Sequence, residues 1–228
     1  MNEAKTIGNV ITQALDVLHK ISKPGGELIV VDDASTDESV EVIRQLATKF
    51  SEIRTVFHAT NKGIGGALIS GYNLATAENI CAIPADGQFD LAQLLQYPMV
   101  ESNTILSFCR YKNEIYSPFR KFLSACNRQL LKCIFKIEIH DINWVKVYKR
   151  ENLKGINFDL DSSLVESEIC IKLIRSGVKL LEVPAVYLQR KYGHSKGASP
   201  KIMMKALVEI PKLFFSIRRF LTVSKNRR

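Results

Sequence analysis

Residues 80–90 read Ile-Cys-Ala-Ile-Pro-Ala-Asp-Gly-Gln-Phe-Asp, a short apolar run followed by the oxygen-bearing side chains of Asp86, Gln88 and Asp90. A buried strand that ends in such a turn brings carboxylates to the crevice at the strand ends of an α/β sheet. Mg²⁺ or Mn²⁺ needs only one or two protein carboxylates there, because water and substrate phosphates supply its other ligands. The stretch therefore predicts either a metal and diphosphate site or a strand followed by a solvated acidic turn.

Two more turns of the same kind follow apolar runs earlier in the chain. Asp32 and Asp33 follow the run 28–31, and Asn61-Lys62-Gly63 follows the run 55–57. In a parallel sheet the carboxyl ends of these strands and of 80–83 would open at one edge. The glycine-rich turn at 61–67 could cradle a phosphate with backbone N–H groups, or it could be a tight turn that lets a helix pack closely.

The elements that must position these turns follow a βαβ pattern. Apolar residues recur at helical spacing over 7–18, 40–47 and 68–74, and they alternate with the three strand-like runs. The second half predicts a helix over 119–137, a strand over 144–148, a helix over 164–174 and a strand over 179–183. A chain of 228 residues, 46% of them hydrophobic, suits one α/β domain, alone or with appendages. It has no apolar run long enough for a membrane span, and its first residues are not typical of a secretory signal.

Two helical patterns combine an apolar face with cations. Residues 119–137 carry an apolar stripe with five Lys or Arg elsewhere on the helix, a pattern typical of a core-facing helix or of a lipid headgroup surface. Pro211 divides the C-terminal region, and Leu213, Phe214 and Ile217 begin an apolar face that continues with Phe220 and Leu221. That face predicts a helix in a membrane interface, or a helix packed on its own domain or on a second subunit.

The net charge of +9 is unevenly distributed along the chain. Residues 110–150 hold 10 Lys or Arg against 3 Asp or Glu, and residues 187–228 hold 11 against 1, whereas residues 1–109 hold 7 against 13. The two basic segments therefore indicate an anionic partner. No helix-turn-helix, RNP-like or zinc-finger motif accompanies the charge, so we expect no nucleic-acid partner. The five cysteines lack metal-ligand spacing and are typical of reduced residues in a cytoplasmic protein.

Several short motifs stand in an order that resembles the family 2 glycosyltransferases, in particular polyprenyl-phosphate sugar transferases of the dolichol-phosphate mannose synthase type. The resemblance covers about residues 2–197. The matching stretches are Asn2-Glu3 with Thr6-Ile7, residues 30–37, residues 61–71, Ala85-Asp86-Gly87-Gln88, Arg110-Tyr111, Arg120 with Ser124 and Asn127, residues 141–144, Glu168, and residues 190–196.

The resemblance implies a glycosyltransferase A-type fold, with a nucleotide-binding α/β domain and a mixed sheet over residues 1–199 and basic amphipathic C-terminal helices over 200–228. It implies that Asp33, beside Asp32, contacts the base and ribose of a UDP- or GDP-hexose, and that Lys62 belongs to the donor site. Asp86, helped by Gln88, would hold Mg²⁺ or Mn²⁺ against the diphosphate. Three residues would close over the donor diphosphate: Arg190, Ser195 and Lys196.

For the acceptor, the resemblance implies an undecaprenyl or dolichyl phosphate gripped by Arg110 and Arg120. Because a phosphate is already anionic, it can attack the sugar directly, and the site needs cations to position it more than a base to activate it. Arg suits that task because its planar guanidinium binds phosphate bidentately. Asp141 is a candidate base or orienting group, and the alternative is a structural partner for a nearby cation. A lipid acceptor predicts a peripheral enzyme docked on an anionic membrane surface.

Two departures from the family pattern give rise to specific expectations. The family begins with a buried strand before Asn-Glu, here Asn2-Glu3, so a central strand beside Leu28–Val31 is expected to be missing. Pro84 stands where the family usually has the first acid of Asp-x-Asp, which predicts weaker or differently arranged metal binding. Two other functions remain open: transfer to a soluble glycan or protein, and a membrane-associated binding module without activity.

Overall fold

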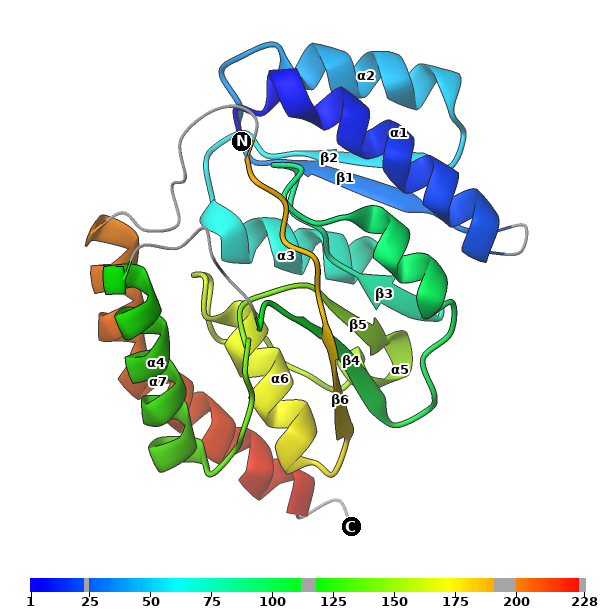
Figure 1. Cartoon of the computed structure of the whole chain (residues 1–228). Helices are drawn as coiled ribbons and strands as arrows, with labels where there is room; N and C mark the ends of the chain where they lie inside the picture. The colour runs from blue at the N-terminus through cyan, green and yellow to red at the C-terminus, as the bar shows by residue number, and fades with distance from the viewer. Residues whose placement is uncertain (23–24, 112–117, 191–199, 226–228) are drawn as a thin grey trace.

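The structure is a computed structural model that describes residues 1–22, 25–111, 118–190 and 200–225 (Figure 1). Within the helices, the side chains of residues 118–124, 127, 200–207 and 224–225 lie outside this description. Every strand predicted from the sequence is present with slightly different bounds.

The first half of the chain alternates helices and strands as expected. Its elements are α1 (Ala4–Ile21), β1 (Leu28–Asp32), α2 (Ser39–Lys49), β2 (Ile53–Phe57), α3 (Gly63–Leu74) and β3 (Asn79–Cys81). A 3₁₀ helix, η1 (Leu91–Gln96), and β4 (Thr104–Cys109) follow. Every residue of β4 is buried, and no separate strand was predicted there.

The second half contains α4 (Pro118–Phe135), β5 (Lys146–Lys149), α5 (Arg150–Leu153), α6 (Val165–Arg175), β6 (Lys179–Pro184) and α7 (Pro200–Lys225). The expected division at Pro211 is wrong, because α7 continues through this residue as one helix of 26 residues. A proline lacks only one backbone donor, and the packing of the helix on the domain outweighs that loss.

The strands form two separate sheets. β1 pairs in parallel with β2, and the other sheet has the mixed order β3-β5-β4-β6, with β4 and β6 parallel and β5 antiparallel to its neighbours. Among the described residues, no strand joins β1 to β3. The break falls beside Leu28–Val31, where the sequence analysis expects a central strand to be missing.

Helices cover both sheets. In Figure 1, α1 and α2 lie on one side of β1 and β2 and α3 on the other, while α6 covers the four-stranded sheet with α4 and α7 outside it. In β4, Ile105 faces the core that includes α6 and α7, whereas Leu106 and Phe108 face the core that includes α1 and β6. A strand buried on both faces needs apolar residues throughout, which explains its continuous apolar sequence.

The C-terminal helix is part of the domain's core. Leu213 and Ile217 are 1% and 3% exposed and belong to the same hydrophobic cluster as α6, and Phe220 and Leu221 pack against that cluster. Of the two interpretations of this apolar face, the structure has the helix packed on its own domain. Among the described residues, no helix is both long and apolar enough to cross a membrane.

Candidate active site

The residues expected to carry the chemistry gather at one edge of the two sheets. Asp32 and Asp33 end β1, the 82–90 loop with Asp86 follows β3, and Arg110 follows β4. β5 is antiparallel, so the residues before it, including Asp141, reach the same edge. The segment after β6 joins them, because the N–H of Leu188 donates to the Gln88 carbonyl at 2.9 Å. The sequence pattern thus located this edge correctly.

The two aspartates of β1 hold the turns around them. Asp32 accepts a hydrogen bond from the Ser35 N–H at 2.9 Å, and it also bonds the Ser35 hydroxyl. The buried Asp33 carboxylate accepts the N–H groups of Lys62 and Gly63 at 2.8 Å and lies 2.8 Å from His58 Nδ1. Burial alone would raise the pKa of Asp33, but these donors outweigh it and hold the pKa below its usual range.

The glycine-rich turn is therefore organised by a protein carboxylate. The N–H groups of Lys62 and Gly63, which could have cradled a phosphate, donate to Asp33. Gly63 has a φ of 78°, and Gly65 lies so close to the Asp161 backbone that an added Cβ would stand 2.3 Å from its carbonyl. The turn needs glycine for these two reasons. These contacts favour the interpretation of residues 61–67 as a tight turn. The close contact that the turn allows is with the loop at Asp161.

Asp86 is a partly buried acid in the loop after β3. Its Oδ1 accepts the Gln88 N–H at 3.1 Å. Burial raises the pKa of Asp86 above its usual value, with the Glu3 carboxylate adding to the effect and Arg190 opposing it. Gln88 is buried, and its side-chain Nε2 lies 3.4 Å from the Leu188 carbonyl. Asp86 is thus an acid whose ionised form a nearby cation would stabilise.

Glu3 and Arg190 form an ion pair beside Asp86, joining the first turn of α1 to the segment after β6. Thr6 reinforces this contact, because its hydroxyl lies 3.1 Å from both Glu3 Oε2 and the Ala85 carbonyl. The sequence analysis matched Glu3 to a motif but gave it no role. Its position immediately before a helix, next to the expected donor site, was the available signal.

Arg110 is held between a carboxylate and two aromatic rings. Its Nε and Nη2 donate to the two Asp141 oxygens at 2.6 and 2.8 Å. The guanidinium carbon also lies 4.0 Å from the centre of the Trp144 ring and 5.4 Å from that of Tyr187. Asp141 is therefore the partner of a cation, as one of its two interpretations expected. The arrangement fixes the orientation of a guanidinium at the edge of the site.

Some expected residues lie outside the description. The backbone of Arg120 is part of α4, but its side chain is not described, and Ser195 and Lys196 fall in the undescribed segment 191–199. The sequence analysis also missed His58, which connects Asp33 to Ser70 through bonds of 2.8 and 2.9 Å. His58 directly follows β2, so the rule that strand ends share one edge could have identified it.

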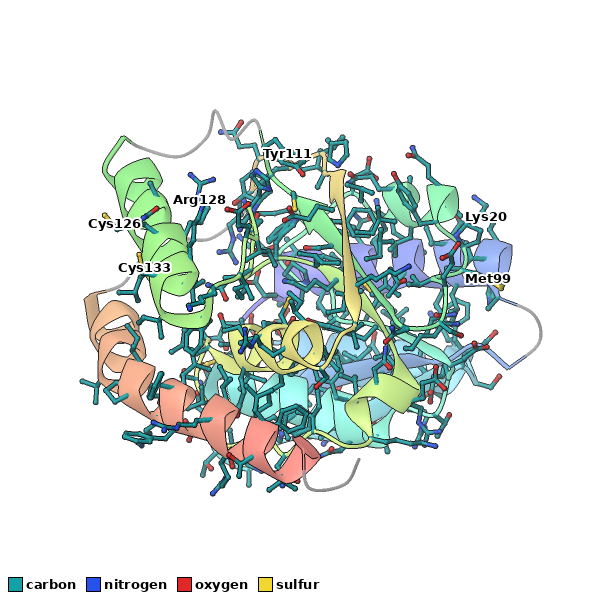
Figure 2. All side chains as sticks on the ribbon, turned by 90° about the horizontal axis from the view of Figure 1, so that it is seen from below. Lys20, Met99, Tyr111, Cys126, Arg128 and Cys133 are labelled. Atoms are coloured by element: carbon teal, nitrogen blue, oxygen red, sulfur yellow. The ribbon has the colours of Figure 1, made fainter. Side chains whose placement is uncertain are left out.

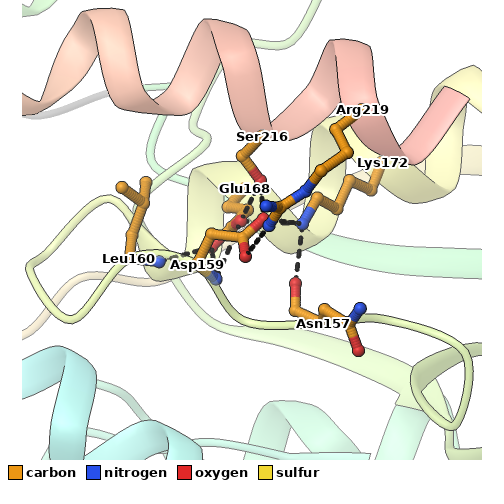
Figure 3. Close-up of polar contacts among 7 residues, drawn as sticks. All are labelled: Asn157, Asp159, Leu160, Glu168, Lys172, Ser216 and Arg219. Atoms are coloured by element: carbon orange, nitrogen blue, oxygen red, sulfur yellow. Dashed lines mark hydrogen bonds and ion pairs between the residues drawn. The ribbon is translucent and has the colours of Figure 1, made fainter. Parts of the chain in front are cut away.

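Glu168, another residue of the family pattern, lies at the centre of a buried polar network (Figure 3). Its carboxylate accepts Lys172 Nζ at 2.7 Å, the Ser216 hydroxyl at 2.5 Å and the Leu160 N–H at 3.2 Å. Arg219 of α7 pairs with the neighbouring Asp159. The network ties α6, α7 and the 157–160 loop together, so Glu168 has a structural role here.

Comparison with known proteins agrees with this geometry. The sequence model described as glycosyl transferase family 2 matches residues 1–159. The chain belongs to that family, and it is a glycosyltransferase. An undecaprenyl-phosphate mannosyltransferase of Micrococcus luteus is 23% identical over 201 residues, which cover 83% of this chain and 82% of that protein.

Solved structures confirm the glycosyltransferase A-type fold. A Pyrobaculum calidifontis mannosyltransferase in complex with GDP-Man and Mn²⁺ superposes with a TM-score of 0.54 at 18% identity, over 96% of this chain and 72% of that one. Glucosyl-3-phosphoglycerate synthase from Mycobacterium tuberculosis in complex with Mn²⁺ and UDP-Glc gives 0.64 at 17% identity, over 93% and 76%. At this identity the likeness establishes the fold alone.

Proposed function

We propose that the protein is an inverting glycosyltransferase that moves a hexose from a UDP- or GDP-sugar to a polyprenyl phosphate, undecaprenyl or dolichyl, at a membrane surface. One observation carries the proposal: a partly buried acid, Asp86, lies next to Arg190 at the sheet edge where Arg110 is also fixed. An acid that can hold a cation, together with separate guanidinium groups, suits a reaction in which both the leaving group and the acceptor are phosphates.

The residues present fit a divalent cation. Among the described residues there is no cluster of three or more potential metal-binding side chains. Mg²⁺ or Mn²⁺ bound to a diphosphate needs no such cluster, because one or two protein oxygens suffice. Asp86 would hold the ion, with Gln88 helping. When bound, the ion would offset the negative charge that grows on the departing diphosphate.

The reaction requires no proton transfer from the acceptor. An oxygen of the polyprenyl phosphate forms a bond to the anomeric carbon of the sugar, and the bond from that carbon to the diphosphate oxygen breaks. The nucleoside diphosphate leaves with the electron pair. Arg110 and Arg120 would orient the acceptor, while Asp32, Asp33 and Lys62 shape the nucleoside side. Arg190, Ser195 and Lys196 would bind the donor diphosphate, so in our proposal Arg190 exchanges Glu3 for phosphate oxygens.

A hollow of about 530 Å³ lies at the start of α1, next to Glu3, and is lined by residues 2–6, Asp37 and Glu38. Its carboxylates would accept hydrogen bonds from ribose hydroxyls if the nucleoside extends from Asp33 toward it. The protein would work in the cytoplasm, where nucleotide sugars are available, and would be peripheral to the membrane that holds its acceptor.

A donor panel tests the proposal. The protein is incubated with UDP-glucose, UDP-galactose or GDP-mannose, each radiolabelled, together with Mn²⁺ and undecaprenyl or dolichyl phosphate. We expect labelled product in the organic phase for one donor, and no such product when the polyprenyl phosphate is omitted. Label in the organic phase without added acceptor, or none with any donor, would contradict the proposal.

The second candidate is transfer to a soluble acceptor. The fold likeness to glucosyl-3-phosphoglycerate synthase favours testing a small phosphorylated acceptor beside glycans and proteins. Label that appears only in the aqueous phase, in a new sugar conjugate, would support this candidate. Absence of transfer to every acceptor, with nucleotide binding retained in calorimetry, would favour an inactive binding module.

A further inference from the structure

Part of the apolar stripe predicted on α4 faces away from the core. Among the described side chains of this helix, Leu131 and Phe135 are buried and Ile134 packs against the core, whereas Cys126, Leu130 and Cys133 are exposed. Spacings of four and seven residues place these three on one side of the helix. The helix therefore faces the core with one side and leaves a second, partly apolar side exposed.

The outward side of α7 has a similar character. Val208 and Phe215 are 67% and 66% exposed and lie seven residues apart, hence on one side of the helix. Lys212 and Arg218 are exposed and flank them. Long cationic side chains beside an apolar ridge can extend to lipid headgroups while the ridge enters the interface.

The two outward sides belong to one flank of the molecule. Figures 1 and 2 show α4 and α7 next to each other at the same side of the domain, and the Phe135 and Phe214 rings lie 6.4 Å apart between them. We define the α4–α7 face as five apolar or thiol residues with two cations: Cys126, Leu130, Cys133, Val208 and Phe215, with Lys212 and Arg218.

We propose that the α4–α7 face docks on an anionic lipid bilayer. A single exposed apolar residue is ordinary, but this group on two adjacent helices marks a contact surface. It belongs to the two sequence segments with the highest cation excess, 10 Lys or Arg against 3 acids and 11 against 1. A second copy would present the same positive face, and the like charges would repel, whereas anionic headgroups would attract it.

The inference rests on the proposed function in one respect, because it names the membrane-facing side of that enzyme. It also revises the expectation for α7, whose face around Leu213 is buried and cannot meet lipid. Docking through α4 would bring the chain segment that follows Arg110 toward the bilayer. The test below uses neither donor nor acceptor, so its outcome is independent of whether sugar transfer occurs.

Vesicle sedimentation tests the face with matched controls. The full chain is mixed with phosphatidylglycerol-containing vesicles and with pure phosphatidylcholine vesicles. We expect binding to the anionic vesicles that weakens with salt, and a loss of affinity of about tenfold or more in Phe215→Glu and in Leu130→Glu. Met99→Glu is the control, because Met99 is 79% exposed and lies on the opposite side in Figure 2.

The charge contribution has its own control pair. Lys212→Glu should weaken binding to anionic vesicles, whereas Lys20→Glu, which changes the net charge equally, should not. Lys212 is exposed three residues before Phe215 on α7, and Figure 2 shows Lys20 on the far side of the molecule. Equal effects of the two reversals would mean that total charge, and not this face, governs binding, and would overturn the proposal.

The native cysteines report on the contact directly. Cys126 and Cys133 are exposed, whereas Cys109 and Cys170 are buried and Cys81 is partly buried. An environment-sensitive fluorophore on the two exposed thiols should brighten and shift to the blue with anionic vesicles. The same label on Met99→Cys, with Cys126 and Cys133 changed to Ser, should not. Unchanged emission from the face, or a dimer in light scattering that Leu130→Glu disrupts, would overturn the proposal.

Discussion

At the scale of single residues, Asp86 destabilises the ligand-free protein while it suits the proposed role of holding a metal ion. Its carboxylate is partly buried and lies near the acid Glu3, and this loss of solvent raises its pKa above the ordinary 3.8. A metal and a diphosphate would supply the positive charge that stabilises the ionised form. The Asp86 carboxylate is therefore placed to bind a cation, and its ionised form destabilises the folded protein when no cation is bound.

Replacing Asp86 should separate these two effects. Because the folded pKa is raised, stability falls as the pH rises from 3.8 through the higher folded value. Asp86→Asn should therefore raise the melting temperature of the ligand-free protein, by about 2–4 °C for about 1 kcal/mol. It should lower transfer by about 100-fold or more.

Calorimetry and the donor assay measure the two outcomes of this substitution. Asp16→Asn, at an exposed position on α1, serves as the control and should change neither quantity. An Asp86→Asn variant that retained metal-dependent transfer would refute the role of Asp86 in catalysis.

Arg110 tests the acceptor side of the proposal. Arg110→Lys keeps the charge but loses the bidentate bond to Asp141 and the stacking on Trp144. We expect kcat/KM for the polyprenyl phosphate to fall by about 10- to 100-fold, which corresponds to about 1.4–3 kcal/mol. The KM for the nucleotide sugar should be unchanged. Steady-state kinetics with each substrate varied in turn would show this, and an equal change in both KM values would contradict it.

The sequence predicted which residues reach the site better than it predicted what they contact. Asp32, Asp33 and Asp86 were located by the rule that apolar runs end at one edge. Their partners could not be predicted, because His58 and the N–H groups that bind Asp33 come from a different strand and turn. Likewise, the stacking of Arg110 on Tyr187 joins residues far apart in the sequence, and only the folded sheet brings them together.

At the scale of elements, α7 is fastened to the domain by the polar network around Glu168. Glu168 and Lys172 are 0% and 1% exposed, so their charges depend on each other and on Ser216. Removing α7 should therefore destabilise the fold, because the loss of the buried Leu213 and Ile217 would expose part of the core.

Glu168→Gln should destabilise the protein strongly. Removing one charge of a buried pair typically costs about 3–5 kcal/mol, and Asp159, 3.4 Å from Lys172 Nζ, would compensate only part of the lost charge. Urea denaturation measures this change in the free energy of unfolding. Glu52→Gln is the matched control: Glu52 pairs with His19 at 2.9 Å on the surface, so the change should stay within about 1 kcal/mol. Similar losses in both variants would contradict the structural role of Glu168.

Helices with one apolar face were predicted correctly, whereas a strand buried on both faces was missed. The amphipathic pattern of α1 and α2 identified them, whereas the fully buried β4 has no alternation and was not predicted as a strand. The stripe on α4 was detected, but a pattern of apolar residues does not indicate whether it faces the core or another surface. In the structure, Ile134 packs against the core while Cys126, Leu130 and Cys133 face outward.

At the scale of the whole molecule, Glu27 connects the two sheets. It precedes β1, accepts the N–H groups of Thr76 and Ala77 before β3, and pairs with Arg54 of β2 at 2.6 Å. Burial alone would raise the pKa of Glu27, but these donors outweigh it and lower the pKa from 4.5 to about 2. The stabilisation is present above pH 4.5 and is lost as the pH falls toward 2.

Glu27→Gln should therefore reduce the pH dependence of stability. Wild-type protein should lose stability between pH 5 and pH 3, and the variant should lose less over the same interval, because its side chain cannot be protonated. Urea denaturation at the two pH values provides the comparison. Glu101→Gln, at an exposed loop position, should behave like the wild type. An unchanged acid dependence in Glu27→Gln would show that Glu27 does not connect the sheets energetically.

The division of the sheet also bears on the order in which the molecule assembles. β1 pairs with β2 across the single helix α2, with Leu28 opposite Ile53, whereas β4 pairs with β6 with Thr104 opposite Lys179, a separation along the chain three times as long. Because closing longer loops costs more entropy and slows folding, the β1–α2–β2 unit should acquire its backbone hydrogen bonds before the four-stranded sheet does. Pulse-labelling hydrogen exchange during refolding should find amides of β2 protected earlier than those of β6.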